Sequence, residues 1–246
     1  MVNRLYIKFL SLIINFIDSK NKNKIINFFK KKLHSQIINV IDVGAHKGET
    51  IDLFYNNFNI NKIFAFEANP KIYESLKDKI SMLKYQNKVH LFNFGIGEKK
   101  ESKDLLIFNE SSSSTYNTIN DTSNYYKRKI KYLSLFNNKK NKLSKKLSTK
   151  IFPLSSIDEI NNLQKIDILK IDTEGYEFNV LKGLNKNQFK NIKYIYFEHH
   201  YDLMIEKNYK YHDIKFLLNQ NNFILSFKIK MNLRKTFEYI YENTSK

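Results

Sequence analysis

The sequence predicts an α/β fold built on a doubly wound, mostly parallel sheet with a C-terminal antiparallel hairpin. Apolar runs of strand length alternate along the chain with segments whose apolar residues recur at helical spacing. This alternation is typical of a parallel sheet that carries helices on both faces. The last two runs, 223–229 and 237–241, lie close together in the chain, so we expect a hairpin that adds an antiparallel edge strand.

The length and composition fit one domain of this class. The chain has 246 residues, of which 42% are hydrophobic, and this is enough to bury a sizeable core. It has no cysteine, which excludes a disulfide framework and a thiolate metal site and fits a cytoplasmic location. We expect an apolar helical arm at 1–34 and one domain at 35–246, with a basic insertion at about 110–150.

The N-terminal arm is apolar at 5–17, with one narrow polar stripe at steps of three and four residues. This stretch is shorter than the roughly 20 residues that span a membrane, and no cleavage site of small residues follows it. The pattern therefore predicts a helix that packs on the domain or on a partner subunit. Peripheral membrane contact through residues 1–20 is the alternative.

The first strand, its turn and the next helix form a pattern that is typical of a cofactor loop. Apolar residues between 37 and 43 predict a buried strand, glycines stand at 44 and 48, and apolar residues recur at helical spacing from 51 to 58. Gly44 lets the backbone approach a ligand, and the free N–H groups of the helix start face the anionic end of that ligand. An ordinary strand-to-helix turn is the alternative.

The acid at position 42 indicates which cofactor this loop takes. A dinucleotide-binding loop has glycine there, because a carboxylate repels a pyrophosphate. S-adenosyl-L-methionine carries an ammonium and a sulfonium cation and no phosphate, so an acid beside the glycine turn suits it. We therefore assign Asp42, Gly44, Ala45 and Gly48 to the methionine end of this cofactor.

The next two strands supply candidates for the rest of the cofactor. Glu67 ends the second apolar run about 20 residues after the glycine turn, where nucleotide-binding folds place the acid that holds the ribose hydroxyls. Asn69 can share the ribose and cap the helix that follows. Asn93, or Gly95 beside it, ends the third strand and is expected to border the adenine.

The middle of the chain has short strands on both sides of a basic insertion. Residues 105–108 and 151–154 predict extra strands around a polar, serine-rich and then basic segment. Between 127 and 150 there are ten lysines or arginines and no acid, a pattern that is typical of a mobile block. A lid or a substrate loop fits this point of the fold.

Four motifs resemble those of the FkbM family of S-adenosylmethionine-dependent methyltransferases, in the same order. They are Asp42-Val43-Gly44-Ala45 with Gly48, Phe66-Glu67-Ala68-Asn69-Pro70, Leu169-Lys170-Ile171-Asp172 with Glu174-Gly175, and the strand that ends in Glu198. The resemblance covers about residues 37–200. It implies a Rossmann-like class I methyltransferase fold, S-adenosyl-L-methionine as the cofactor, and O-methylation of a sugar, a glycan or another small-molecule hydroxyl.

Three residues that follow or end later strands are the catalytic candidates. Asp172 is the first choice to deprotonate or orient the acceptor hydroxyl and Glu174 is the second, with a helix cap as the alternative for Asp172. His199 is the third, as a general base in the run Glu198-His199-His200. This run could also bind a divalent cation or be merely polar, and we expect no metal. Neighbouring residues on a strand face opposite sides, so at most one of these histidines points into the site.

The formal charge of +18 makes nucleic acid an alternative partner. Nearly all the basic residues are lysine, and the chain is rich in Asn, Ile, Phe and Tyr, as an AT-rich genome produces whatever the function. Pro70 and Pro153 are the only prolines, so the proline-rich string of base-directed amino methyltransferases is absent from the sequence. We therefore expect a small-molecule or glycan acceptor and keep an RNA-directed methyltransferase as the alternative.

Overall fold

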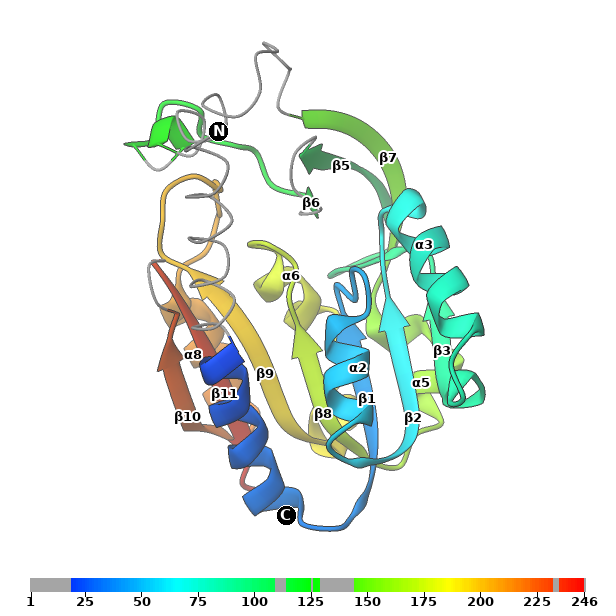
Figure 1. Ribbon diagram of the computed structural model, residues 1–246. Coiled ribbons are helices and arrows are strands. Elements are labelled where there is room, and N and C mark those ends of the chain that lie inside the picture. The colour runs from blue at the N-terminus through cyan, green and yellow to red at the C-terminus, as the bar shows by residue number, and fades with distance from the viewer. Residues whose placement is uncertain (1–18, 109–113, 125, 129–143, 232–234, 246) are drawn as a thin grey trace, which may run out of the picture.

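A seven-stranded sheet forms the centre of the computed structural model, in the order β10-β11-β9-β8-β1-β2-β3 (Figure 1). Strands β1, β2, β3, β8 and β9 run parallel to one another, as the sequence predicts. The strands are β1 (Ile37–Val43), β2 (Asn59–Phe66), β3 (Val89–Phe92), β8 (Ile166–Ile171), β9 (Ile192–His200), β10 (Phe223–Lys230) and β11 (Thr236–Asn243). The structure describes residues 19–108, 114–124, 126–128, 144–231 and 235–245.

Helices cover both faces of the sheet and bury two apolar layers. One layer contains side chains of α5, α6, α7 and α8, and the other contains side chains of α2, α3 and the helix at residues 19–33. Strand β8 lies between the layers, and all six of its residues are buried. The helices are α2 (Glu49–Tyr55), α3 (Pro70–Ser81), α5 (Asp158–Asn161), α6 (Glu177–Lys182), α7 (Lys186–Asn191) and α8 (Tyr211–Gln220), with 3₁₀ helices η1 (Gln86–Lys88) and η2 (Leu154–Ser156).

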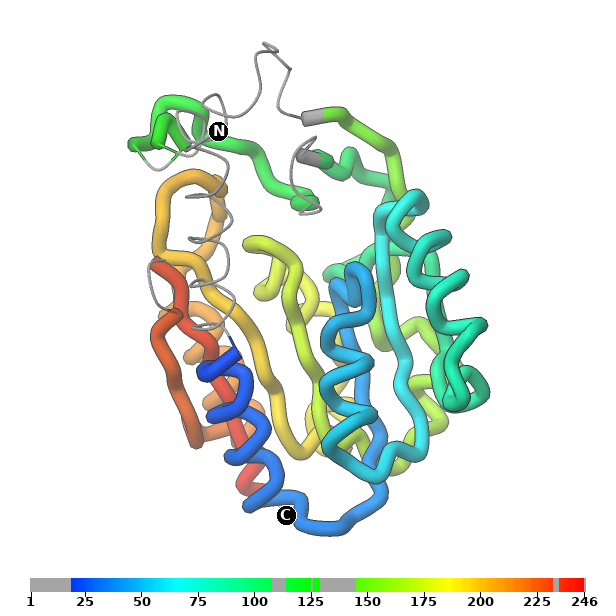
Figure 2. Tube along the Cα trace, in the orientation of Figure 1, coloured from blue at the N-terminus to red at the C-terminus, as the bar shows by residue number. Residues whose placement is uncertain are grey.

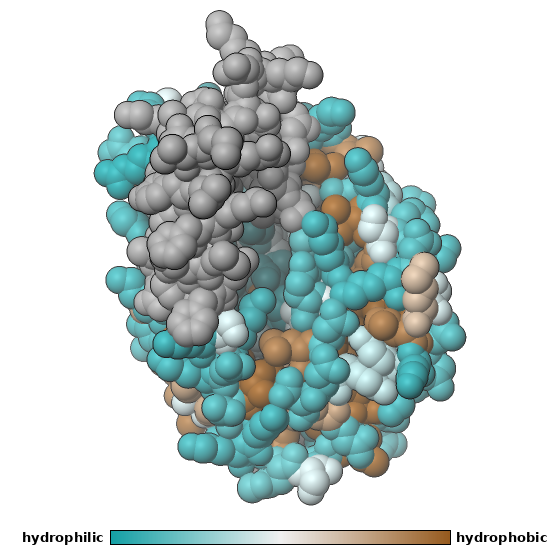
Figure 3. Space-filling model, viewed as in Figure 1, coloured by the Kyte–Doolittle hydropathy of each residue, from teal (hydrophilic) through white to brown (hydrophobic). Residues whose placement is uncertain are grey.

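The helix at residues 19–33 packs against the sheet. Phe29 is fully buried, and its ring centroid lies 6.0 Å from that of Phe54 in α2 and 5.7 Å from that of Tyr194 in β9. The apolar stretch at 5–17 lies outside the described residues, so the boundary between arm and domain stays a prediction. None of the helices in the described ranges is long and apolar enough to cross a membrane. Hydrophilic residues predominate among the coloured ones on the face shown in Figure 3.

The C-terminal hairpin is confirmed, and it supplies the antiparallel edge strand that the sequence predicts. β10 and β11 pair antiparallel, and β11 also pairs antiparallel with β9. The last strand therefore lies inside the sheet, and β10 forms the edge. The physical reason is burial: Tyr239, Ile240 and Tyr241 of β11 are almost completely buried, whereas Ile224 and Leu225 of β10 stay exposed.

A second sheet of four strands, in the order β4-β7-β5-β6, includes described residues from both ends of the insertion. Its strands are β4 (Gly95–Ile96), β5 (Glu101–Phe108), β6 (Ser114–Thr115) and β7 (Ser144–Phe152). The end of the basic block is thus a strand rather than a loop. Lys145, Lys146 and Lys150 lie opposite Ile107, Leu106 and Ser102 of β5, so no lysine of this strand pair faces another across the ladder. Residues 129–143 of the block lie outside the described part of the chain.

The segment after β6 crosses to the loop that follows β9. The N–H of Asn120 donates to the carbonyl of Met204 at 2.8 Å, and the N–H of Glu206 donates to the carbonyl of Thr118 at 2.9 Å. Figure 2 shows the two segments side by side, at the end of the molecule where β8 and β9 end. The insertion is therefore fixed near the carboxyl ends of the strands.

Candidate active site

A cavity of about 610 Å³ lies at the carboxyl ends of β1, β2, β8 and β9. In open α/β sheets ligands bind at this edge, and the volume falls in the range of small-molecule sites. Residues from both halves of the sheet line the cavity, among them Ala45, Glu67, Asp172, Glu174, Glu198 and Glu238.

The turn between β1 and α2 contains residues with a left-handed backbone. The φ angles are 84° at Gly44, 48° at His46 and 79° at Gly48. The N–H groups of Gly44 and Ala45 both donate to the carbonyl of Phe66, at 2.9 and 3.0 Å, and these bonds tie the turn to β2. Gly44, Ala45 and His46 line the cavity, whereas Gly48 is the N-cap residue of α2 and is not part of the lining.

The close approach at Gly44 is to the protein itself. A Cβ there would lie 1.9 Å from the backbone carbonyl oxygen of Asp172. The ends of β1 and β8 meet at this point, where the N–H of Asp172 donates to the carbonyl of Val43 at 2.9 Å. Strand packing is thus one reason for a glycine here, and the approach of a ligand to Gly44, which lines the cavity, stays a prediction.

Gly44→Ala is expected to lower the free energy of unfolding by at least about 2 kcal/mol, because it adds left-handed strain and a clash with backbone. Gly97→Ala is the matched control, since its Cβ would meet only side-chain atoms of Ile151 and Tyr176. Urea denaturation of both variants and the wild type measures the difference. Equal losses in the two variants would contradict the backbone clash.

Glu67 follows β2 and is held from several sides at the cavity wall. Its Oε2 accepts from the N–H of His46 at 2.9 Å, and its Oε1 accepts from the N–H of Asn69 at 2.8 Å. The side chain of Asn93 donates to the Glu67 carbonyl at 2.9 Å, and that of Asn69 caps α3 through the N–H of Lys71 at 3.1 Å. Burial raises the pKa of Glu67, although both N–H bonds oppose the shift. The structure thus brings Glu67, Asn69 and Asn93 together, with Glu67 on the cavity side.

Asp42 lies behind the cavity wall. Its side chain is fully buried, is not part of the lining, and places Oδ1 3.2 Å from Nζ of Lys170. Burial raises the pKa of Asp42, and the Lys170 ammonium opposes that shift. Lys170 itself lines the cavity and lies 3.3 Å from Oδ2 of Asp172. In this geometry Lys170, rather than Asp42, reaches the space that a ligand can occupy.

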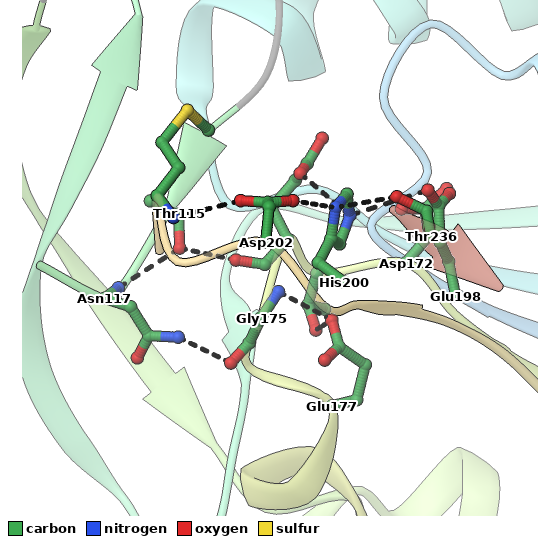
Figure 4. Close-up of polar contacts among 12 residues, drawn as sticks. Thr115, Asn117, Asp172, Gly175, Glu177, Glu198, His200, Asp202 and Thr236 are labelled. Atoms are coloured by element: carbon green, nitrogen blue, oxygen red, sulfur yellow. Dashed lines mark hydrogen bonds and ion pairs between the residues drawn. The ribbon is translucent and has the colours of Figure 1, made fainter. Parts of the chain in front are cut away.

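Carboxylates gather at the end of the cavity formed by β8, β9 and β11. Asp172 and Glu174 follow β8, Glu198 lies on β9, and Glu238 lies directly opposite Glu198 on β11. The Nε2 atom of His200 lies 3.3 Å from Oε2 of Glu174 and 3.5 Å from Oε1 of Glu198 (Figure 4). The acceptor end of the cavity is therefore rich in negative charge, with one imidazole at its border.

Two groups at this end of the cavity, Glu198 and His200, have pKa values above their ordinary ones. Burial, together with the charge of Asp172, raises the pKa of Glu198 to about 8. Burial opposes the charge of His200, but a hydrogen bond with Asp202 and the charge of Glu174 raise its pKa to about 9. A protonated imidazole cannot accept a proton, and this favours a carboxylate as the base at this end of the cavity.

The stability of the protein is expected to fall between pH 6.5 and pH 9. Folding raises the pKa of Glu198 from 4.5 to about 8 and that of His200 from 6.5 to about 9, so the folded state holds more protons than the unfolded state in this range. The contribution of each group is therefore lost as the pH rises through its folded pKa. We expect a lower midpoint of thermal unfolding at pH 9 than at pH 6.5, and a smaller difference in Glu198→Gln/His200→Gln. An unchanged pH dependence in that variant would contradict this origin.

His199 lies on the other face of β9 and does not belong to the cavity. It is 2% exposed, and its ring centroid lies 4.8 Å from that of Tyr201 and 5.9 Å from that of Tyr211. Burial lowers its pKa to about 3, so the ring is neutral. The alternation of the strand places Glu198 and His200 on the opposite face, where Glu198 lines the cavity and His200 contacts Glu174 and Glu198 at its border. The assignment of a site histidine therefore moves from His199 to His200.

Glu177 holds the loop after β8, and it is not among the site residues that the sequence predicts. It is fully buried, and its Oε1 accepts from the N–H of Gly175 at 2.7 Å and from the hydroxyl of Thr173 at 3.2 Å. The loop needs this support because Glu174 and Gly175 have φ angles of 49° and 94°. The hydroxyl of Thr115 donates to the carbonyl of Glu174 at 2.7 Å (Figure 4). An acid within the apolar stripe of α6 was the signal for this role.

The structure gives no support to a helix cap by Asp172. α6 begins at Glu177, its N-cap residue is Tyr176, and no side-chain hydrogen bond caps it. The side chain of Asp172 is 36% exposed and contacts Lys170. Among the residues that the structure describes, no group of three or more His, Cys, Asp or Glu side chains is arranged to hold a metal ion.

Comparisons with known proteins agree on the fold. The family model described as "Methyltransferase FkbM domain" matches residues 42–225. The methyltransferase FkbM from Methylobacillus flagellatus KT is 13% identical with a TM-score of 0.52, and the match covers 83% of this chain and 44% of that chain. The magnesium protoporphyrin IX methyltransferase from Synechocystis PCC 6803, a structure with bound SAM, is 9% identical with a TM-score of 0.53. The match covers 94% of this chain and 82% of that chain. A comparison with curated proteins gives no match.

The chain thus spans less than half the length of the Methylobacillus protein. Both solved structures share its Rossmann-like class I methyltransferase fold. The family model covers most of the chain and includes the turn after β1, Glu67, Asp172 and Glu198. The chain therefore belongs to the FkbM family of methyltransferases.

Proposed function

We propose that this chain transfers a methyl group from S-adenosyl-L-methionine to a hydroxyl of a small molecule or glycan. The observation that carries the proposal is the convergence of two sets of residues on one cavity. The turn at 44–46 and Glu67 lie on one side, and Asp172 and Glu174 lie on the other. Membership of the family supports methyl transfer, and the carboxylates support a hydroxyl acceptor.

The residues on the β1–β2 side fit this cofactor. Each carboxylate oxygen of Glu67 accepts one backbone N–H bond, and a carboxylate has about four acceptor positions, so Glu67 can also accept from two ribose hydroxyls. Gly44 and Ala45 present backbone and one methyl group to the cavity, which leaves room for the methionine end. The cofactor, when bound, supplies a methyl group on a sulfonium.

The residues on the β8 side handle the acceptor. A hydroxyl has to lose its proton as its oxygen is methylated, and we assign that proton to the carboxylate of Asp172, with Glu174 as the second choice. His200 stays charged beside Glu174 at neutral pH and keeps that carboxylate oriented. Alignment of reacting groups can contribute roughly 7–11 kcal/mol, so the bonds that fix the loop after β8 serve the reaction directly.

The charge of the cavity favours an acceptor without phosphates. A phosphodiester at the β8–β9 end would face Asp172, Glu174 and Glu238, and this makes RNA the weaker proposal despite the basic insertion. RNA binding that weakens steeply with salt would reverse this order.

We also propose a cytoplasmic protein that touches the membrane surface through residues 1–20. Co-sedimentation with anionic vesicles, lost on deletion of residues 1–18, tests that part.

Two experiments test the proposed function. Calorimetry with S-adenosylhomocysteine and with NADH should give binding of the first only. Incubation of the protein with methyl-labelled S-adenosylmethionine and a small-molecule extract of cells or, in parallel, total cellular RNA, followed by mass spectrometry, should give an O-methylated product in the small-molecule extract. Label that appears only in RNA, or tight binding of NADH, would contradict the proposal.

A further inference from the structure

A buried lysine lies between two acids at the centre of the site. Lys170 is the one lysine among the buried residues of the described part of the chain, and its side chain is 9% exposed. It stands in β8, whose other residues pack into the apolar layers except for Asp167 at the far end. An ammonium at such a position costs free energy unless it is paired.

The pairing of Lys170 depends on strand register. Asp42 is its direct neighbour across the β1–β8 ladder, and Oδ1 of Asp42 lies 3.2 Å from Nζ. Asp172 lies two residues farther along, on the same side of the chain, with Oδ2 3.3 Å from Nζ. The ammonium thus joins a fully buried acid to an acid that lines the cavity.

Asp42 has no other role in the described structure. Its Oδ2 is buried and makes no hydrogen bond to any described residue, and its side chain is not part of the cavity lining. Two apolar side chains at 42 and 170 would fill this position at lower cost, because a buried ion pair is often less stabilising than hydrophobic residues of similar volume. The ion pair of Asp42 and Lys170 therefore has a role other than stabilising the fold.

The residue that this ion pair affects is Asp172, which Lys170 contacts. Its carboxylate has other acids nearby, Glu198 on β9 and Glu238 on β11, and the phenol of Tyr196 on β9 also faces this space. Each of these acids repels Asp172 when it is ionised, and among the described residues Lys170 is the cation in ion-pair contact with Asp172. Removing the ammonium leaves the carboxylate to turn away from its neighbours toward solvent.

We propose that Lys170 is a positioning residue, anchored by Asp42, that holds the carboxylate of Asp172 where it meets the acceptor hydroxyl. This inference rests on the proposed function. The acceptor oxygen would gain the methyl group as the bond between that methyl and the cofactor sulfur breaks and S-adenosylhomocysteine leaves, while the O–H bond breaks and the proton passes to Asp172. Lys170 and Asp42 take no part in the proton transfer itself. They keep one oxygen of Asp172 engaged so that the other faces the cavity.

The test compares Lys170→Met with Lys170→Arg and with the control Lys165→Met. Lys165 also pairs with an acid of β8, Asp167 at 2.7 Å, but at the opposite end of the strand. Methyl transfer into the small-molecule extract should fall roughly 10²-fold in Lys170→Met, which is the cost expected of a misplaced reacting group. Lys170→Arg should recover at least a tenth of the wild-type rate, and Lys165→Met should match the wild type.

Calorimetry with S-adenosylhomocysteine separates positioning from cofactor binding. The dissociation constant of Lys170→Met should stay within about threefold of the wild type, because the lost contact is to Asp172. Wild-type turnover in Lys170→Met, or a loss of cofactor affinity that accounts for the whole loss of rate, would overturn the proposal. So would failure of arginine to restore any activity.

A double variant keeps the test valid if Lys170→Met does not fold. Asp42→Asn/Lys170→Met leaves no buried charge without a partner, so it should fold and should still be slow. A crystal structure of this variant should show the Asp172 carboxylate turned from its present position. An unchanged carboxylate would refute the inference even if no acceptor is found. A separate outcome would contradict the proposed function itself: a wild type that neither binds S-adenosylhomocysteine nor methylates anything in the extract.

Discussion

Asp172→Asn should lower the rate of methyl transfer by roughly 10²–10⁴-fold, because an amide cannot take the proton of the acceptor hydroxyl. Affinity for S-adenosylhomocysteine should change little, since the residues that fit the cofactor lie across the cavity around Glu67. The measurement is the initial rate of label transfer into the small-molecule extract, beside a calorimetric titration of the same protein.

Glu174→Gln is the matched variant for this test, since it changes the second carboxylate of the same loop. It should lose less activity than Asp172→Asn if Asp172 is the base. A larger loss in Glu174→Gln would exchange the two roles. Near-normal turnover in both variants would remove the loop after β8 from the chemistry. Urea denaturation has to show that each variant keeps its fold.

Much of the fold could be predicted because it depends on local patterns. Alternating apolar runs and helical stripes predict parallel strands with helices on both faces, and the carboxyl ends of such strands meet at one edge. Glu67 and Asp172 follow from that rule alone, since each comes directly after an apolar strand. The sequence alone therefore predicts at which edge of the sheet the cavity lies.

Local patterns do not determine contacts between distant segments. The position of β11 inside the sheet depends on its pairing with β9, and no local pattern encodes a strand order. The pairing of Asp42 with Lys170 joins residues 128 positions apart, so it depends on the register of β1 and β8. The sequence shows the two acids and the lysine, but not that Asp42 pairs with Lys170 behind the cavity wall.

The choice between His199 and His200 illustrates the same limit. Alternation predicts that one of the two faces the site, but not which one. The decision comes from the phase of the strand: Phe197 and His199 face the layer under α8, so Glu198 and His200 lie on the face that borders the cavity. If Phe197 is assigned to the core, His200 becomes the expected site histidine. The pairing of β9 with its neighbouring strands is what establishes that Phe197 is buried.

Glu67→Ala should weaken the binding of S-adenosylhomocysteine by roughly 10²–10⁴-fold. Two ribose hydroxyls would lose a charged acceptor, and hydrogen bonds to charged groups contribute about 1.5–3 kcal/mol each. The N–H groups of His46 and Asn69 would also lose their acceptor, so the turn after β1 and the start of α3 would lose a shared support. Glu67→Gln keeps one acceptor oxygen and should lose roughly tenfold.

Glu49→Gln is the matched control for Glu67, because Glu49 also lines the cavity beside the same turn. Its carboxylate contacts the ring of His46, at 3.0 Å, rather than the backbone that Glu67 supports. Affinity should therefore stay close to that of the wild type in Glu49→Gln. Together with the Asp172 variants, this gives opposite expectations for the two ends of the cavity: changes at Glu67 act on binding and changes at Asp172 act on transfer. If Glu67→Ala binds S-adenosylhomocysteine normally while Asp172→Asn does not, the cofactor lies in the opposite direction, and the acceptor belongs over the turn after β1.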